Sequence, residues 1–375
     1  MTNDIRIISR AHNPFPRHGI ALDASGVARY TDLPPSLLAM LRQHVERAPE
    51  VEAVAELGGE RLSYGELWDR SARIAGGLRA AGLQPGQCVA ITHPAGVQWV
   101  LAYWGVMMAG GISVAVNTRL TPAEIDYIRR DAGVVHEIGP DHEASVDEPF
   151  VTTDVAADTV VTIFYTSGTT GHAKGVPFTH ENLLASSRNI VDALRIEAAS
   201  PADVRTLISV PLFHVTGCNT QMMVAAFLGG TSVVMPQFDR DRFIAAISAE
   251  RINFIITVPA IYALILRTPE FEALVDGFGM TETTSIIAAL PDEDSFEYAD
   301  SVGYAVPTID LGIVPLDAAD PDTGELVARG GNVTGGYWGK PEETAQAFRD
   351  GWYYTGDVVR VDGHGRLYLV DRKKD

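Results

Sequence analysis

The sequence has few of the features that mark secreted, zinc-binding or nucleic-acid-binding proteins. Its 375 residues include only two cysteines, Cys88 and Cys218, which lie far apart and suggest no disulfide framework. Positive charge is also scarce, because 29 lysines and arginines face 48 acidic residues and leave a net charge of −19. That balance argues against a nucleic-acid partner. The ten histidines show no ligand spacing such as His-x-x-x-His, so no zinc site is predicted.

Targeting and membrane-spanning segments are not apparent either. Residues 1–6 are polar and show no signal peptide. The uncharged stretch 99–116 is long enough to consider a membrane span. Glycines at 110 and 111 interrupt it and β-branched residues follow, so we expect a buried helix and then a buried strand. With few cysteines in addition, the sequence predicts a cytoplasmic protein without a transmembrane segment.

What the chain does contain is a repeated alternation of helix and strand patterns. Its length predicts two or three structural units, and a hydrophobic content of 46% is enough for large cores. The alternation runs through residues 1–150 and again through 151–300, which is typical of βαβ units around mostly parallel sheets. Residues 301–370 instead hold short β-rich pieces separated by turn pairs. We therefore predict an α/β protein with two doubly wound subdomains and a small antiparallel β-barrel-like subdomain.

Several of the predicted helices begin with a recognisable capping pattern. Ser63 with Glu66 forms a capping box, and Thr121 is followed by proline at the first helical position and Glu124 at the third. Thr179 predicts the start of another helix. The other predicted elements are strands 88–92, 112–116, 206–210, 231–235 and 253–258, and helices 96–109, 219–228, 241–251 and 341–349.

The densest group of potential ligand-binding residues is the loop 166–175, Thr-Ser-Gly-Thr-Thr-Gly-His-Ala-Lys-Gly. The β-branched and aromatic residues 159–165 precede it and predict a strand. The loop offers bare backbone N–H groups, hydroxyls and the charge of Lys174, all of which bind polyphosphates. Its composition fits a flexible surface linker equally well.

This loop is not a Walker A motif, which needs Gly-Lys-Ser/Thr leading directly into a helix. Gly175 follows Lys174, and Pro177 disfavours helical geometry in the residue before it. The sequence also has no Gly-x-Gly-x-x-Gly motif, so a dinucleotide site has no support. We therefore expect a loop that hangs between two strands and can close over phosphates.

Five blocks, taken in order, resemble the adenylate-forming superfamily, which includes acyl-CoA synthetases, aryl-CoA ligases, luciferases and nonribosomal adenylation domains. Residues 165–175 resemble its phosphate loop, although the family usually has proline at the position of Ala173. The later blocks resemble the acyl-site motif, the adenine and magnesium motif, the ribose motif and the start of the hinge, at 211–214, 277–283, 351–357 and 371–375. With Gly324-Glu-Leu and Gly336-Tyr-Trp338 between them, the resemblance extends from about residue 35 to the end.

The resemblance implies that the protein activates a carboxylic acid with ATP, releasing pyrophosphate, and then transfers the acyl group from acyl-AMP to CoA. It implies catalytic roles for Lys174, Thr281, Glu282 and His214. Glu282 is the expected Mg²⁺ ligand, with Thr166 as a weaker candidate. The residues implied to bind ATP or AMP are Thr166, Ser167, Gly168, Thr169, Thr170, Gly171, Lys174, Phe278, Gly279, Thr281, Asp357 and Arg372.

The acid substrate is expected beside His214, in a pocket whose other members are small or apolar: Val215, Gly217, Cys218 and Met280. Such a lining favours an uncharged fatty or aromatic acid. Amino-acid-activating members of the superfamily normally carry an aspartate near this position, where this chain has Val215 and Thr216. A homodimer is left open.

Ordinary structural roles remain alternatives for most of these residues. Thr281-Glu282 could simply begin a helix, and Asp357 could be a turn residue. Arg372 could be a solvated charge and Phe278 a core aromatic. His214 could be a structural histidine. Two other functions also stay open: a ligase that passes acyl-AMP to a carrier protein, and a non-catalytic nucleotide-binding module.

Two departures from the family pattern affect the expected activity. The chain stops at Asp375, on the hinge, where family members continue into a smaller C-terminal domain with a second lysine for adenylation. We expect the large domain alone to bind ATP and acid but to catalyse poorly. In addition, residues 268–276 run almost directly into Gly277, where the family has a few tens of further residues. A deletion and an omitted segment are both open explanations.

Overall fold

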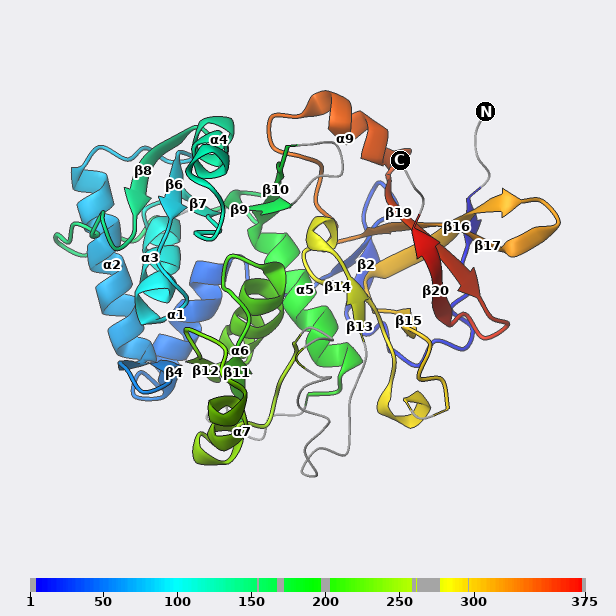
Figure 1. The fold of residues 1–375 in the computed structure, drawn as a ribbon, viewed down its shortest axis with the longest axis horizontal. Helices are drawn as coiled ribbons and strands as arrows, with labels where there is room; N and C mark the ends of the chain where they lie inside the picture. The colour runs from blue at the N-terminus through cyan, green and yellow to red at the C-terminus, as the bar shows by residue number, and fades with distance from the viewer. Residues whose placement is uncertain are drawn as a thin grey trace.

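The computed structural model describes residues 5–153, 155–166, 172–196, 203–257, 261, 277–295 and 297–372. Helices and mostly parallel sheets form one side of the molecule, and antiparallel strands form the other (Figure 1). This arrangement confirms the predicted α/β class with an additional antiparallel, curled sheet. The joint at 268–276 and the last hinge residues, 373–375, lie outside the described residues.

The first sheet contains the strands on either side of the proposed phosphate loop. Its five strands have the order β10-β9-β7-β6-β8. Strands β6, β7, β8 and β9 run parallel to one another, whereas β10, at the edge, is antiparallel to β9. The loop therefore lies between two strands, as predicted, and the structure shows that these strands pair antiparallel. The strands are β6 (Cys88–Ile91), β7 (Ile112–Ala115), β8 (Val134–Ile138), β9 (Val160–Thr166) and β10 (Lys174–Thr179).

The second sheet has four strands in the order β11-β12-β4-β5, of which β5 alone in this sheet is antiparallel to its neighbour. Phe254 makes an isolated parallel bridge to Thr206 of β11, within the predicted strand 253–258. Both sheets combine strands from before and after residue 150. The strands are β4 (Glu52–Glu56), β5 (Arg61–Ser63), β11 (Arg205–Ile208) and β12 (Thr231–Val234).

The capping patterns define helix starts as expected. Ser63 and Glu66 bond reciprocally at the start of α2, and Thr121 and Glu124 do so at α4. Thr179 caps α5. The predicted helix 219–228 is wrong in detail, because a π-helix, η2 (Thr216–Met222), precedes α6. The α-helices of the two α/β parts are α1 (Leu37–Arg47), α2 (Tyr64–Ala80), α3 (Val97–Met108), α4 (Pro122–Ala132), α5 (His180–Ala193), α6 (Met223–Leu228) and α7 (Arg240–Ala249).

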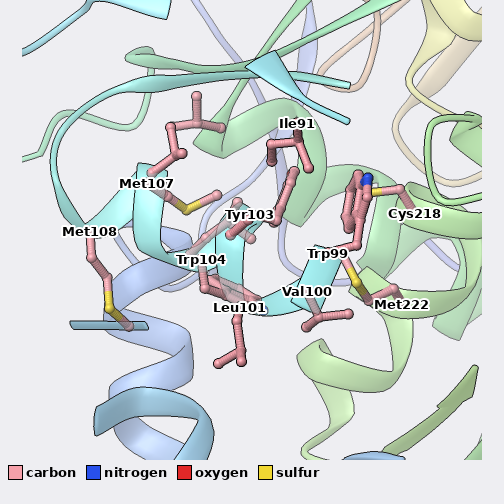
Figure 2. Packing of buried hydrophobic residues seen from close by; sticks show 14 of the residues in the cluster. Ile91, Trp99, Val100, Leu101, Tyr103, Trp104, Met107, Met108, Cys218 and Met222 are labelled. Atoms are coloured by element: carbon pink, nitrogen blue, oxygen red, sulfur yellow. The ribbon is translucent and has the colours of Figure 1, made fainter. Parts of the chain in front are cut away.

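Helix α3 is the most buried helix of the core, which explains the long uncharged stretch in the sequence. Trp99 stacks on Tyr103 with ring centroids 5.2 Å apart. Figure 2 shows Trp99 beside Cys218 and Met222 of η2, so the core joins the two α/β parts. The helix-then-strand prediction for 99–116 is confirmed by α3 and β7. In the described part of the chain, no helix has the length and apolar character needed to cross a membrane.

The antiparallel part begins before residue 301 and also uses the N-terminus. Its large sheet has the order β1-β16-β17-β19-β18, with β20 paired to β19. A three-stranded sheet, β13-β14-β15, packs into the same hydrophobic cluster. The elements are β1 (Arg6–Ile7), β2 (Ile20–Leu22), β3 (Ala28–Tyr30), β13 (Gly277–Gly279), η3 (Thr281–Thr283), β14 (Ile286–Ala289), η4 (Asp292–Asp294), β15 (Tyr304–Ala305), β16 (Ile309–Asp317), β17 (Asp320–Gly330), α9 (Pro341–Ala347), β18 (Phe348–Arg349), β19 (Trp352–Val361) and β20 (Leu367–Arg372).

The buried histidine at the start of α5 should make stability depend on pH. His180 is 1% exposed, and its Nδ1 accepts a hydrogen bond from the Leu37 N–H of α1 (3.2 Å). Burial lowers the pKa of His180 from 6.5 to about 4. The unfolded chain therefore binds this proton more readily, and stability present above the unfolded pKa falls as the pH drops from about 6.5 toward 4.

We expect this group to cost the native state up to about 3 kcal/mol between pH 7 and pH 4, at about 1.4 kcal/mol per pKa unit. Urea unfolding at several pH values would measure it, with His180→Asn as the matched control. The asparagine keeps an acceptor for the Leu37 N–H but does not titrate. Parallel pH curves for the two proteins would contradict the prediction.

Candidate active site

The two ends of the proposed phosphate loop are paired in one hairpin. Thr166 ends β9 and lies directly opposite Lys174, which begins β10. The ammonium group of Lys174 lies 4.9 Å from the centre of the Tyr337 ring. The loop residues between them that were predicted to bind nucleotide lie outside the described residues: Ser167, Gly168, Thr169, Thr170 and Gly171.

Gly175 lies where the two hairpin strands approach each other closely. A Cβ atom at this position would lie 3.0 Å from Ile163 Cγ2 and 3.1 Å from Tyr165 Cζ. Contacts that short are tighter than usual, so a larger residue here would require the Ile163 and Tyr165 side chains to shift by a few tenths of an ångström. Because Lys174 directly precedes it in β10, this glycine also helps to set the position of the lysine.

The predicted metal-binding residue lies in the turn between β13 and β14. Thr281 and Glu282 occupy the short helix η3. The Glu282 Oε1 atom accepts a hydrogen bond from the Tyr337 hydroxyl (2.9 Å), and the Glu282 carbonyl accepts one from the Thr334 N–H (2.9 Å). Both the side chain and the backbone of Glu282 are thus held by the segment that follows β17.

The residue that closes this turn is in a strained conformation. Thr284 has φ = 63°, which is rare for a β-branched residue. Its hydroxyl donates to the Asn332 carbonyl (2.6 Å), and its own carbonyl accepts from Asn219 Nδ2 (2.9 Å). These contacts from η2 and from the end of β17 hold the turn in a shape that the local sequence disfavours.

A buried amide network lies beneath the same turn. Asn332 is 0% exposed, and its Nδ2 donates to the Thr283 carbonyl (2.9 Å). Its Oδ1 accepts from Asn189 Nδ2 of α5 (3.1 Å), and Asn189 Oδ1 accepts from the Tyr30 hydroxyl (3.0 Å). The sequence analysis missed Asn332, and no local pattern distinguishes it from a turn residue after a strand.

The two residues predicted at the ribose site are neighbours. Asp357 of β19 and Arg372 of β20 are opposite each other in the strand register, and Arg372 Nε lies 3.2 Å from Asp357 Oδ1. The Asp357 side chain is 13% exposed and that of Arg372 is 73% exposed. Burial raises the pKa of Asp357, and the charge of Arg372 opposes that rise.

A cavity of about 460 Å³ brings the hairpin together with η3 and the segment before η2. It extends from β7 and α4 to the phosphate loop. Burial lowers the pKa of His214, so this side chain is neutral at neutral pH. His214 Nδ1 lies 3.1 Å from Thr216 Oγ1. The lining residues that matter here are Ala115, Tyr127, Thr166, His172, His214 and Thr281.

The outer wall of this cavity is a cluster that the sequence analysis did not identify. The rings of Tyr127 and His172 stack with centroids 4.8 Å apart, which places the end of the phosphate loop against α4. Asp131 accepts a hydrogen bond from the Tyr165 hydroxyl (2.9 Å) and pairs with Lys340. The cluster thus ties α4, β9 and the start of α9 to one another around the loop.

Comparison with known proteins identifies the family of the chain. The family model described as AMP-binding enzyme matches residues 41–150, 135–275 and 267–338. This chain belongs to that family, within the adenylate-forming superfamily. It is 32% identical to a feruloyl-CoA synthase of Amycolatopsis sp, over 88% of this chain and 77% of the relative.

Two further relatives fall in the same superfamily. A long-chain-fatty-acid–CoA ligase, FadD13, of Mycobacterium tuberculosis is 30% identical, over 90% of this chain and 78% of the relative. The crystal structure of O-succinylbenzoate coenzyme A synthetase from Bacillus subtilis, in complex with AMP, superposes with a TM-score of 0.82. That pair shares 26% identity, over 90% of this chain and 98% of the other. The predicted superfamily is therefore confirmed.

The predicted acyl-pocket residues of this AMP-binding enzyme divide into two places. Val215, just before η2, and Gly217 and Cys218 within it are buried, with Cys218 packed near Trp99 (Figure 2). Met280 is half-buried against the hydrophobic cluster of the antiparallel sheets. Of the predicted acyl-pocket set, His214 is the member that lines the 460 Å³ cavity.

The adenine-motif residues are placed at the antiparallel side of the enzyme. Phe278 is half-buried and packs against the same cluster as Met280. A Cβ atom at Gly279 would lie 2.0 Å from the Ser285 carbonyl oxygen, so only glycine lets β13 and β14 approach there.

Glu282 and Thr166 are suitable ligands for a magnesium ion that arrives bound to ATP. Within the described residues, no group of three His, Cys, Asp or Glu side chains could hold a metal ion. Mg²⁺ needs only one or two carboxylates when phosphate and water oxygens complete its shell. Glu282 is half-buried, and its carboxylate is already oriented by Tyr337. Thr166 supplies a hydroxyl at the cavity that Thr281 also lines.

Proposed function

We propose that this AMP-binding enzyme activates a carboxylic acid with ATP to acyl-AMP and pyrophosphate, and then transfers the acyl group to CoA. The observation that carries the proposal is that Tyr337 contacts both Lys174 and Glu282, although the three residues come from distant parts of the chain. A cation and a carboxylate held by one side chain are the pair that a metal-bound triphosphate needs. Family membership and the CoA ligases among its relatives support the same reaction.

The chemistry requires the enzyme to bring two anions together. The carboxylate of the acid attacks the α-phosphorus of ATP, the bond to the bridging oxygen breaks, and pyrophosphate leaves. Lys174 would neutralise the departing pyrophosphate, and Thr281 would donate a hydrogen bond to the α-phosphate. Magnesium held by Glu282 would supply further positive charge on the phosphates. Holding the reactants in line lowers the barrier further.

Binding of the nucleoside would use the pair on β19 and β20. The Asp357 carboxylate is shielded from solvent and is an acceptor for two ribose hydroxyls, as acidic residues are at other nucleotide sites. Arg372 lies next to it and is largely exposed, which suits contact with the charged end of the nucleotide.

The acid is proposed to be uncharged apart from its carboxylate, and fatty or aromatic. The predicted pocket residues that follow His214, namely Val215, Gly217 and Cys218, are small or apolar and buried, and burial lowers the pKa of His214. The feruloyl-CoA synthase and the long-chain-fatty-acid–CoA ligase are named for an aromatic acid and for fatty acids, in agreement with that lining.

The acceptor thiol is proposed to approach through the 460 Å³ cavity. The cavity reaches His214 and Thr281 from the side of α4, and the buried predicted acyl residues of η2 do not line it. Its wall is partly apolar, with Leu120 and Ile128, and it would accommodate a narrow amide-containing arm.

Acid-dependent ATP–pyrophosphate exchange by the full-length protein tests the first step. Exchange is expected with members of a panel of fatty and aromatic acids, and a complete lack of exchange with all of them would overturn the enzyme function. Product trapping tests the second step. A CoA thioester is expected, whereas an acyl product found only on a holo-carrier protein would favour the carrier-protein ligase instead.

A further inference from the structure

One segment joins the strand that carries Lys174 to the turn that carries Glu282. This bridging segment is residues 334–338, Thr-Gly-Gly-Tyr-Trp, between β17 and α9. The Thr334 N–H donates to the Glu282 carbonyl (2.9 Å), and the Thr334 hydroxyl donates to the Pro177 carbonyl of β10 (2.6 Å). The Trp338 N–H donates to the Gly175 carbonyl (2.8 Å). The backbone contacts alone thus reach both halves of the proposed triphosphate site.

Tyr337 makes side-chain contacts to two charged groups of the proposed site. Its hydroxyl donates to Glu282 Oε1 (2.9 Å), and the face of its ring lies 4.9 Å from Lys174 Nζ. The hydroxyl and the ring therefore contact two different groups, which have opposite charge. We propose that Tyr337 is a positioning residue that orients the Glu282 carboxylate for the metal and the Lys174 ammonium for pyrophosphate. This inference rests on the proposed adenylation function.

The position of the tyrosine is built into the surrounding structure. Gly336 has φ = 144°, and a Cβ atom there would lie 2.4 Å from Thr344 Cγ2. The close approach lets the Tyr337 N–H donate to Thr344 Oγ1 of α9 (2.9 Å). The ring then meets Phe348 edge to face, with centroids 5.8 Å apart. A ring fixed at its backbone and at its edge can hold its two charged neighbours in fixed places.

The Tyr337 hydroxyl is the donor in its contact with Glu282. A protonated phenol must donate when it faces a carboxylate, because an ionised carboxylate can only accept. One oxygen of Glu282 is thereby used by Tyr337, which fixes the rotation of the carboxylate group.

The two contacts can be separated by substitution. Tyr337→Phe removes the hydroxyl and keeps the ring over Lys174, whereas Tyr337→Leu removes both. Tyr368→Phe is the matched control, since that tyrosine, on β20, also donates to a carboxylate, that of Asp362 (3.4 Å). Thermal unfolding of each variant shows whether the fold is kept. The measurements are Mn²⁺ affinity in the presence of ATP by electron paramagnetic resonance, and the magnesium and pyrophosphate dependence of exchange.

We expect Tyr337→Phe to weaken Mn²⁺ binding with ATP by about tenfold or more, the range seen when a partner of a metal ligand is lost. The magnesium concentration for half-maximal exchange should rise by a similar factor. Tyr337→Leu should add a roughly two- to fivefold rise in KM for pyrophosphate, from loss of the ring–ammonium contact. Tyr368→Phe should match the wild-type protein in all three measurements.

The outcomes distinguish this inference from the proposed function. Tyr337→Phe with wild-type Mn²⁺ affinity and wild-type magnesium dependence would overturn the positioning role, even though the enzyme exchanges pyrophosphate. Lack of exchange by the wild-type protein would instead overturn the adenylation function, and the Mn²⁺ measurement would still decide the orientation of Glu282. A change of equal size in Tyr368→Phe would also count against a specific role for Tyr337.

Discussion

Glu282→Gln is expected to reduce acid-dependent ATP–pyrophosphate exchange by about 10²- to 10³-fold, which corresponds to roughly 3–4 kcal/mol of lost transition-state stabilisation. Glutamine has nearly the same size, and its amide oxygen can still accept the hydrogen bond from Tyr337. The backbone contact between Glu282 and Thr334 is unaffected, because it uses the carbonyl group. The substitution therefore removes the charge proposed to bind magnesium while leaving the turn in place.

The matched control is Glu293→Gln. Glu293 lies on η4, outside the bridging segment, and its exposed carboxylate pairs with Arg195. We expect this variant to exchange at the wild-type rate and Glu282→Gln to unfold at the wild-type temperature. If Glu282→Gln kept exchange within about threefold of the wild-type rate, the proposed metal site would be wrong.

Asn332→Ala should have the largest effect on stability, lowering the free energy of unfolding by about 3 kcal/mol. The Asn332 side chain is fully buried and makes hydrogen bonds to Thr283, Ile286 and Asn189. Truncation removes all three hydrogen bonds from a fully buried place, each worth about 1 kcal/mol, although the Thr283 carbonyl still accepts from the Ser285 N–H (2.7 Å). Because Thr283 directly follows Glu282, exchange should fall as well, by about tenfold.

Urea denaturation with a linear extrapolation measures the stability change. Asn13→Ala is the comparison, because the Asn13 amide donates one hydrogen bond to the Ala305 carbonyl (2.8 Å) in a less buried place. That variant should lose about 1 kcal/mol, with exchange unchanged. Equal losses of unfolding free energy in the two variants would show that the amide network under the turn stabilises the protein no more than a single hydrogen bond does.

The two substitutions act on different parts of the same turn. Glu282→Gln changes a charge and should leave stability unaltered, whereas Asn332→Ala changes the support and should alter stability and activity together. The difference follows from exposure. The Glu282 side chain reaches a half-open site, while that of Asn332 lies wholly inside the protein.

Much of the fold could be predicted because its signals are local in the chain. The capping boxes at Ser63 and Thr121 involve residues three positions apart, and both form as expected. The position of the phosphate loop between two strands was also predictable, because Pro177 and Gly175 argue against a helix directly after Lys174. The prediction of a helix starting at 219 was wrong, since a π-helix depends on packing rather than on local propensity.

The order of the sequence motifs was enough to place the chain in its family and to name Lys174, Glu282 and Asp357 as candidates. Those residues carry distinctive charges within short, ordered blocks, so they can be recognised without coordinates. The sequence also predicted the pairing of helix and strand in the core stretch 99–116, because burial on all sides leaves an uncharged run.

Only the tertiary structure decided which residues support those candidates. The Tyr337 hydroxyl meets Glu282 across 55 positions, and Asn189 meets Asn332 across 143 positions. Strands β4 and β5 likewise join a sheet with strands that follow them by more than a hundred residues. Such contacts depend on how distant strands close upon one another, and they impose no period and no spacing on the sequence. A tyrosine between a glycine and a tryptophan therefore has the same local pattern whether it lies in solvent or holds a carboxylate.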